Sequence, residues 1–437
     1  MPDLTRFKLL WGRLRQTLWW RPALWSAAAV AAAVASFGVD AWLPAEWLPR
    51  LPPGVVDDLL HIMASSMLVV STFALSVLAG AYASAASAGT PRATRLVVAE
   101  PHSQKAVAVF LAAFIFSVVG VIALGSGRYG PSGRMALFVC ALAVLAWVVV
   151  SFMRYIDVLS RIGLVSHTIE TVERAAAQSL QEYFRQPLGG ARAADAPPAG
   201  ARPVLCRQTG HVQFVDLPAL QALARACEGH VHLAVHAGDL VHPAQPLAWL
   251  LDTRPRPAGQ ATDVTAALEQ AVEAELRDAF VIRPERSFEQ DAGFGLIVLA
   301  EIAQRALSPA VNDPGTAIAV IGSQTRLLIE ALAAPPDAEA LVHDRLTTAA
   351  AQPQALVAIA YEAIARCSLS QFEVMMQWLR HLAALVANAP PPMQSAARAL
   401  VQRVLARAMR CGADTADVQA WQAEARSLGL VPAGHPA

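Results

Sequence analysis

Four long and nearly uncharged apolar stretches lie within the first 155 residues, and they constrain the fold more than any other feature of the sequence. A helix that crosses a bilayer needs about 20 mostly apolar residues, because the lipid interior offers the backbone no hydrogen-bond partners. The sequence therefore predicts four transmembrane helices near the N-terminus. They cover roughly residues 22–43, 59–86, 106–124 and 135–153.

The flanks of these stretches predict how the helices are oriented. Lys and Arg gather on the cytoplasmic side of membrane helices, and here they are more frequent before the first stretch, after the second and after the fourth. We therefore expect a multi-pass protein of the bacterial inner (plasma) membrane with both termini in the cytoplasm, residues 1–21 forming the N-terminal segment. The basic residues on the expected cytoplasmic side are Arg6, Lys8, Arg13, Arg15, Arg21, Arg92, Arg95, Lys105, Arg154, Arg161 and Arg174.

One face of the second stretch differs from the rest of the apolar region, because it carries small and hydroxylated residues. At roughly 100° per residue these positions fall within about a third of the helix circumference. Close packing of helices through small residues is the ordinary explanation, and a hydrated pathway lined by hydroxyl groups is the alternative. The candidate face consists of Ser65, Thr72, Ser76, Gly80 and Ser84.

Composition excludes several classes of function. The chain has 34 basic and 34 acidic residues, so no excess of positive charge indicates nucleic-acid binding. Five cysteines without a CxxC pair argue against a disulfide framework. No nucleotide-binding or zinc-protease motif is present. We therefore expect no metal and no cofactor, and the sequence leans against an enzyme.

The remainder of the chain predicts a cytoplasmic α+β domain, so that the fold class is a mainly α membrane protein. Residues 156–202 form a connecting helix and linker, whose apolar stripe packs either on a second copy or in a core. Residues 203–260 form a small β-barrel-like subdomain, and residues 261–335 and 336–437 are two helical regions.

Within the β-rich segment, alternating residues predict a strand over 230–236, followed by a turn at Gly238-Asp239. This order resembles the small barrel of biotinyl and lipoyl carrier domains, but the segment has no Lys to modify, which excludes a carrier role. His230, His232 and His236 are expected on the outward face of the strand. A solvated strand face explains them as well as a metal site does.

The stretch from 279 to 317 contains the densest set of polar residues with defined spacing. Asp291 and Asp313 are each placed to begin a helix, and Arg286 can tie loops by a bidentate pair. These structural roles explain the set without a ligand. The alternative is one ligand-binding or subunit-contact site made by Glu285, Arg286, Gln290, Asp291, Glu301, Arg305, Ser308, Asn312 and Asp313.

Two motifs in this stretch resemble the DUF2254 family of predicted bacterial membrane proteins. They are the acidic-Arg-x-x-x-Gln-Asp pattern at 285–291 and Leu-Ser-Pro-x-x-Asn-Asp-Pro at 307–314. The resemblance covers roughly residues 10–335 and includes the four spans and the Gly-Asp turn. The sequence departs from it at Thr90-Pro91-Arg92. The family implies topology and motif positions, but no activity or catalytic residues.

Two functions from different classes remain open. The first is an oligomeric channel or transport-type protein, regulated by its cytoplasmic domain, with any pore between subunits. The second is a membrane-anchored scaffold or sensor that binds a protein or a small ligand without a pore. The expected partners are the lipid bilayer, further copies of the chain, and a small ion or small molecule.

Overall fold

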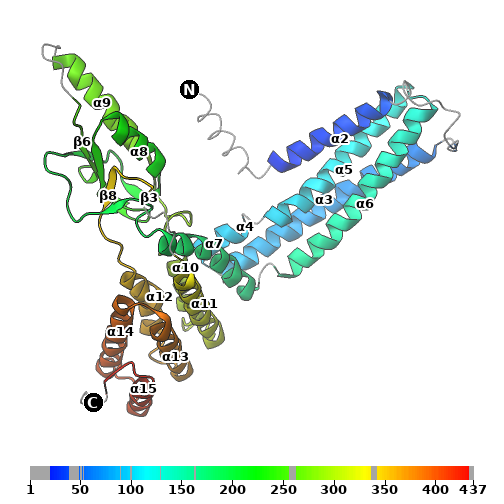
Figure 1. The fold of residues 1–437 in the computed structure, drawn as a ribbon. Helices are drawn as coiled ribbons and strands as arrows, with labels where there is room; N and C mark the ends of the chain where they lie inside the picture. Colours follow the sequence, from blue (N-terminus) through cyan, green and yellow to red (C-terminus); the bar gives the residue numbers. More distant parts are fainter. Residues whose placement is uncertain are drawn as a thin grey trace. The chain divides into compact units, whose positions relative to one another are not determined.

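The computed structural model describes residues 20–38, 49, 52, 54–88, 90–98, 101–127, 129–161, 164–254, 262–335 and 342–432. The chain divides into an N-terminal unit, residues 1–168, and a C-terminal unit, residues 169–437. The regular elements of the N-terminal unit, over its described residues, are all helices (Figure 1). Its helices are α2 (Trp20–Gly38), α3 (Val55–Ala88), α4 (Pro91–Val98), α5 (Pro101–Gly125) and α6 (Pro131–Arg161).

Helix α5 is central to the N-terminal unit and contacts α2, α3 and α6. Gly120 of α5 allows close approach, because a Cβ there would lie 2.9 Å from a methyl carbon of Leu60. Two buried tyrosines join helices by bonds to backbone carbonyls. The Tyr129 hydroxyl donates to Ala33 O and the Tyr155 hydroxyl to Ala74 O, both at 2.6 Å.

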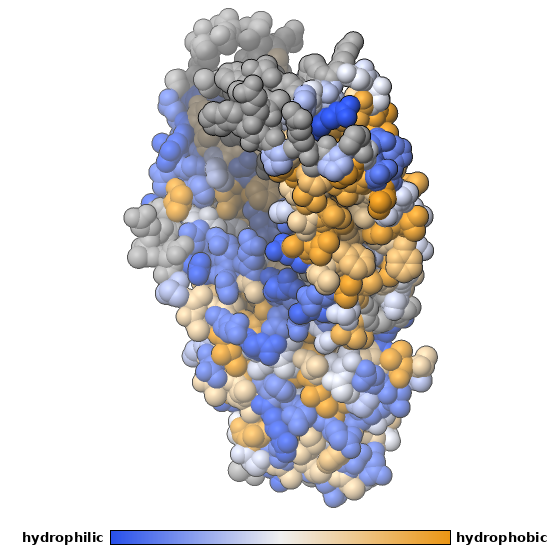
Figure 2. Space-filling model, turned by 90° about the vertical axis from the view of Figure 1, so that its right-hand side faces the viewer, coloured by the Kyte–Doolittle hydropathy of each residue, from blue (hydrophilic) through white to orange (hydrophobic). Residues whose placement is uncertain are grey.

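The exterior of this unit is apolar. Val69, Phe73 and Ile122 are each about two-thirds exposed, at 68%, 65% and 68%. Figure 2 shows such residues gathered in a continuous orange area. Exposed apolar patches of this kind mark surfaces that another apolar phase covers, and hydrocarbon fits helices of this length.

Four helices in the described ranges are long and apolar enough to cross a membrane: Val55–Ser84, Lys105–Gly125, Pro131–Arg161 and Pro314–Ala333. The first three lie on α3, α5 and α6, and these helices contain the predicted second, third and fourth stretches. The predicted first stretch is helical as far as Gly38, with a shorter apolar core, and its residues 39–43 lie outside the described ranges. The fourth helix belongs to the C-terminal unit and is the least hydropathic, with half of its apolar window buried.

The C-terminal unit combines two small β-sheets with a group of helices (Figure 1). One sheet has the order β1-β8-β4-β6-β2 and the other β5-β3-β7. The strands are β1 (Arg192–Ala193), β2 (Arg202–Leu205), β3 (Gly210–Val215), β4 (His230–Leu233), β5 (Leu240–Val241), β6 (Pro246–Leu251), β7 (Phe280–Arg283) and β8 (Leu346–Thr348). The helices are α7 (Val165–Arg185), α8 (Leu217–Ala226), α9 (Thr262–Asp278), α10 (Phe294–Ala306), α11 (Pro314–Ala333), α12 (Gln354–Cys367), α13 (Phe372–Asn388), α14 (Pro391–Arg410) and α15 (Thr415–Ser427).

The predicted barrel is wrong, because the described strands form two open sheets rather than a closed one. Three of the strands come from outside residues 203–260. β1 lies in the predicted linker, β7 precedes the polar motif, and β8 lies in the region predicted to be helical. β8 pairs in parallel with both β1 and β4, a long-range contact that local sequence pattern does not encode.

The outward-facing position predicted for His232 is also wrong. Its side chain is buried, and Nδ1 lies 3.0 Å from the hydroxyl of Thr347 in the neighbouring β8. His236 makes a similar pair, with its Nε2 at 2.7 Å from Thr348 Oγ1. The two histidines therefore join the unforeseen strand to the sheet.

Helix α7 packs within the C-terminal unit. Four residues of its predicted apolar stripe, which are Ile169, Val172, Ala176 and Leu180, are buried, so the stripe belongs to a core rather than to a contact between copies. Its polar side is anchored to α11, because both carboxylate oxygens of Glu173 accept from Arg326, at 2.7 and 2.8 Å. Ser323 donates a third bond to the same carboxylate at 2.7 Å.

The remaining helices pack around large buried side chains. α10 contacts α11 and α12, α11 contacts α13, and α15 contacts α13 and α14. Trp378 and Tyr361 are fully buried, and the indole donates to the Tyr361 carbonyl at 3.2 Å. The Tyr361 hydroxyl lies 2.8 Å from Thr325 Oγ1. Met375 and Leu379 of α13 are fully buried as well.

Replacement of Gly295 by Ala tests the contact between α7 and α10. A Cβ at this position would overlap the Cβ of Ala176, and such overpacking costs about 1–3 kcal/mol. Gly322→Ala in α11 is the matched control, because its Cβ would meet His381 at an ordinary 3.6 Å. We expect thermal unfolding of the full chain in detergent to shift down for Gly295→Ala only. Equal shifts would contradict the contact.

The burial of His232 predicts that acid weakens the sheet. Burial lowers the pKa of His232, and the nearby His236 lowers it further. A histidine whose folded pKa is depressed stabilises the fold above its unfolded pKa and loses this contribution as the pH falls toward the folded value. Between about pH 7.5 and about pH 5, wild type should therefore lose more thermal stability than His232→Gln. Equal losses would show that His232 does not titrate on unfolding.

Candidate functional site

The polar motif around residue 290 is organised by a buried ion pair. Arg286 Nε donates to Asp291 Oδ2 at 2.6 Å, and Arg286 Nη2 donates to Asp291 Oδ1 at 2.8 Å. Asp291 Oδ1 also accepts from the backbone N–H groups of Gly293 and Phe294, at 3.1 and 3.0 Å. The carboxylate thus satisfies the first donors of α10 and the guanidinium together.

Gly238 lies against this ion pair, which explains the Gly-Asp turn of the sequence. A Cβ there would lie 2.5 Å from Asp291 Oδ2 and 2.9 Å from Arg286 Nη2, and its φ is +97°. Both the close approach and the left-handed backbone require glycine. The Gly-Asp turn and the polar motif, recognised separately in the sequence, are therefore one structural feature.

The same motif is tied to strand β3. The Gln290 amide pairs with the backbone of Val215, accepting from its N–H at 2.8 Å and donating to its carbonyl at 3.2 Å. Gln213 Nε2 donates to the carbonyl of Glu285 at 2.7 Å. Glu285 is thus tied to β3 through its backbone carbonyl and not through its carboxylate.

The second part of the predicted set lies after α10. Asp313 caps α11, accepting from the Thr316 N–H at 3.0 Å and from its hydroxyl at 2.6 Å. These bonds lower the pKa of Asp313. Asn312 has a φ of +48° and accepts from Gln371 at 3.0 Å. The Ser308 hydroxyl donates to the Arg305 carbonyl at 2.7 Å.

The nine predicted residues therefore fall into two groups at opposite ends of α10. The helix has 13 residues, which gives about 20 Å at 1.5 Å per residue. Glu301 is half-buried and Arg305 is exposed, and both lie on the helix between the groups. The structure thus gathers residues 285–291 at the start of α10 and residues 308–313 after its end, and a ligand-binding or subunit-contact role for these residues stays a prediction.

The chemistry open to the Arg286–Asp291 group is limited. Two nitrogens of the guanidinium and both oxygens of the carboxylate are already bonded within the protein. In the described part of the chain no group of three or more His, Cys, Asp or Glu is arranged to hold a metal ion. The arrangement positions α10, β3 and the Gly238 turn.

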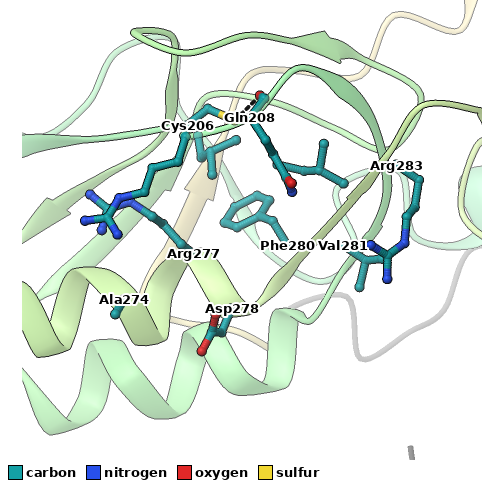
Figure 3. Close-up of a pocket in the computed structure, with 11 residues that line it drawn as sticks. Cys206, Gln208, Ala274, Arg277, Asp278, Phe280, Val281 and Arg283 are labelled. Atoms are coloured by element: carbon teal, nitrogen blue, oxygen red, sulfur yellow. Dashed lines mark hydrogen bonds between the residues drawn. The ribbon is translucent and has the colours of Figure 1, made fainter.

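Sequence reasoning missed a cavity of about 420 Å³ between α9, strand β7 and the segment that follows β2 (Figure 3). Three arginines line it: Arg207, Arg277 and Arg283. They are far apart in the sequence and belong to different elements, so no local motif connects them. Strand β7 forms one wall, since all four of its residues line the cavity. Strand β3 packs closely on the Arg283 end of this strand, where a Cβ at Gly210 would lie 2.6 Å from the Arg283 carbonyl oxygen.

The small-residue face of α3 lies on the outside of the N-terminal unit. All five of its predicted members are exposed, which means that they contact no other helix of this chain extensively. The Ser65 hydroxyl donates to the His61 carbonyl at 3.0 Å, and the Thr72 hydroxyl donates to the Leu68 carbonyl at 2.9 Å. The members are Ser65, Thr72, Ser76, Gly80 and Ser84.

Four helices long and apolar enough to cross a membrane, three of them in the N-terminal unit, define a multi-helix membrane protein. The chain belongs to the family described as "Predicted membrane protein (DUF2254)", whose model matches residues 15–384. The match confirms the resemblance found in the sequence and extends it past residue 335.

Two mycobacterial proteins are similar to the chain. An uncharacterised protein of Mycobacterium bovis is 27% identical over 285 residues, 62% of this chain and 51% of the relative. An uncharacterised protein of Mycobacterium tuberculosis (strain H37Rv) matches to the same extent. The chain thus spans about half the length of these relatives. No solved structure matches it.

Comparison of Asp291→Ala with Asp313→Ala tests how much the ion pair stabilises the C-terminal unit. Both aspartates cap helices, but only Asp291 is buried and paired with Arg. Breaking a buried pair costs about 3–5 kcal/mol, whereas loss of an exposed cap costs about 0.5–2 kcal/mol. We expect the larger loss of thermal stability for Asp291→Ala. A smaller loss than for Asp313→Ala would contradict this role.

Proposed function

We propose that the chain is a homo-oligomeric protein of the bacterial inner membrane, of channel or transport type, in which α3 faces a neighbouring copy. Helices α2, α3, α5 and α6 span the bilayer, and both ends of the chain lie in the cytoplasm. The distribution of Lys and Arg around the spans supports this orientation. The C-terminal unit then regulates the assembly from the cytoplasmic side.

The observation that carries the proposal is the exposed small-residue face of α3. Ser76 and Gly80 point away from the unit's own core, although small residues in membrane helices are enriched where two helices meet. A neighbouring copy supplies the missing helix. A pathway for a small ion or small molecule would run between subunits, since the helices of one chain pack around an apolar core that includes Leu60, Phe116 and Leu137.

A second function has its own support. Ser65 and Thr72 bond to carbonyls of their own helix, so these hydroxyls need neither water nor a partner. The C-terminal unit also contains the arginine-lined cavity. A membrane-anchored sensor that binds a small ligand, without a pore, accounts for both facts.

Cysteine crosslinking in native membranes tests the subunit contact. We expect Ser76→Cys to give a disulfide-linked dimer under mild oxidation, because the same face of two copies meets there. Val149→Cys on α6 is the matched control, as Val149 is 50% exposed on a different helix. The parent chain with its five native cysteines is the reference. Equal crosslinking of both variants, or of neither, would contradict the contact.

Flux through liposomes containing the purified chain then separates the two functions. If small ions pass through the parent chain and the Ser76→Trp variant blocks them, the result would support a pathway at this face. Crosslinking at position 76 without any flux would favour the anchored sensor.

A further inference from the structure

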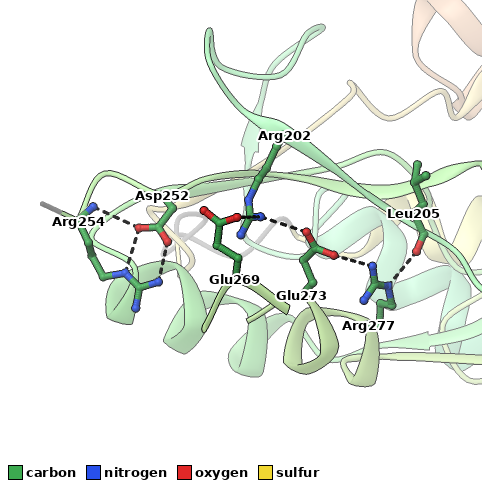
Figure 4. A network of polar contacts seen from close by, with 7 residues as sticks. All are labelled: Arg202, Leu205, Asp252, Arg254, Glu269, Glu273 and Arg277. Atoms are coloured by element: carbon green, nitrogen blue, oxygen red, sulfur yellow. Dashed lines mark hydrogen bonds and ion pairs between the residues drawn. The ribbon is translucent and has the colours of Figure 1, made fainter. Parts of the chain in front are cut away.

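The arginine-lined cavity lies where α9 packs against the β-strands, and a network of ion pairs fixes one of its walls (Figure 4). Glu273 of α9 accepts from Arg202 at 3.1 Å and from Arg277 at 2.7 Å. Arg277 Nε also donates to the Leu205 carbonyl at 2.9 Å. Arg277 is therefore held in one position, with 16% of its side chain exposed.

The third nitrogen of the Arg277 guanidinium, Nη1, makes no hydrogen bond with the described residues. It is also buried. Buried donors in folded proteins almost always have an acceptor, whether protein, water or ligand. Because this nitrogen is sealed from solvent, Arg277 contributes a fixed positive charge to the cavity wall rather than a hydrogen bond to a ligand.

The charge around the cavity exceeds what the protein neutralises. Arg277 is paired with Glu273, but Arg207 and Arg283 are exposed, and no ion pair involves either of them in the part of the chain that the structure describes. Asp278 also lines the cavity and offsets one of these two charges. The balance of the lining is positive and favours an anion.

Most of the remaining lining is apolar, which favours a ligand that also carries an apolar group. Phe280 lies between Arg277 and Arg283 (Figure 3), and Leu247 and Ile282 also contribute to the lining. A volume of about 420 Å³ falls within the range of small-molecule sites, about 300–1,000 Å³. Apolar walls with a few convergent polar groups are typical of such sites.

We propose that this cavity binds a small organic oxyanion, a phosphate or carboxylate attached to an apolar group. The oxyanion pairs with the exposed Arg283, while Arg207 and Arg277 add positive charge to the walls, and the apolar group packs on Phe280. The site lies within one C-terminal unit and does not depend on the proposed oligomer. An anionic lipid headgroup and a free metabolite both have this chemistry.

Binding of phenyl phosphate to the full chain tests the site. The protein is placed in nanodiscs of phosphatidylcholine, which has no net charge, and titrated with phenyl phosphate and with inorganic phosphate by calorimetry. We expect phenyl phosphate to bind more tightly, since it also fills the apolar part. Arg283→Gln should weaken binding by about tenfold, the equivalent of one lost charged contact. Arg207→Gln should act in the same direction.

Arg410→Gln is the matched control, because Arg410 is an exposed arginine near the end of α14 and does not line the cavity. It should leave the affinity unchanged. Arg207 and Arg283 are exposed, so their variants are expected to fold, and thermal unfolding checks this. No binding of phenyl phosphate, or equal binding by all variants, would overturn the proposal.

Added phosphatidylglycerol distinguishes the two sources of the oxyanion. Competition between this lipid and phenyl phosphate, lost in Arg283→Gln, would support the site and assign it to a lipid headgroup. Undiminished binding of phenyl phosphate beside the lipid would support the site and assign it to a soluble anion.

Discussion

The ion pair of Arg286 and Asp291 fixes three segments of the C-terminal unit that are distant in the sequence. A carboxylate removed from water is unfavourable unless its oxygens find donors. Asp291 meets this requirement only where the guanidinium and the first N–H groups of α10 converge. The Gly238 turn must then pass directly over the pair, and Gln290 must reach β3. The start of α10, the turn and the strand thus depend on one carboxylate.

The N-terminal unit obeys a different constraint. Its core is formed by contacts of α5 with its neighbours, while its surface retains large exposed side chains such as Phe73 and Ile122. Such a surface is unfavourable in water and ordinary in hydrocarbon. In lipid, association of helices relies on small residues and close backbones rather than on burial of apolar surface. This is why the proposed contact between copies is placed at the small residues of α3 and not at the apolar residues around them.

Features encoded by short-range pattern were predictable from the sequence. The second, third and fourth spans, strand β4 and the caps of α10 and α11 follow from hydropathy, alternation and Asp placement. Features that depend on distant pairing were not. The side chain of His232 is buried because β8 covers it, and the sequence near residue 232 gives no sign of that strand. The arginine-lined cavity combines positions 207, 277 and 283, which become neighbours only when β7 pairs with β3.

The parallel strand β8 has a consequence for synthesis of the chain. Val231 of β4 pairs with Leu346, and Arg192 of β1 pairs with Thr347, so the five-stranded sheet cannot be completed until the ribosome has passed residue 348. Until then β4 presents an open edge, and open edges invite pairing with other chains. Non-local strand pairing is also slow to form. Truncated or stalled chains that end before β8 would therefore expose this edge, and aggregation of unfinished chains is the hazard specific to this order of strands.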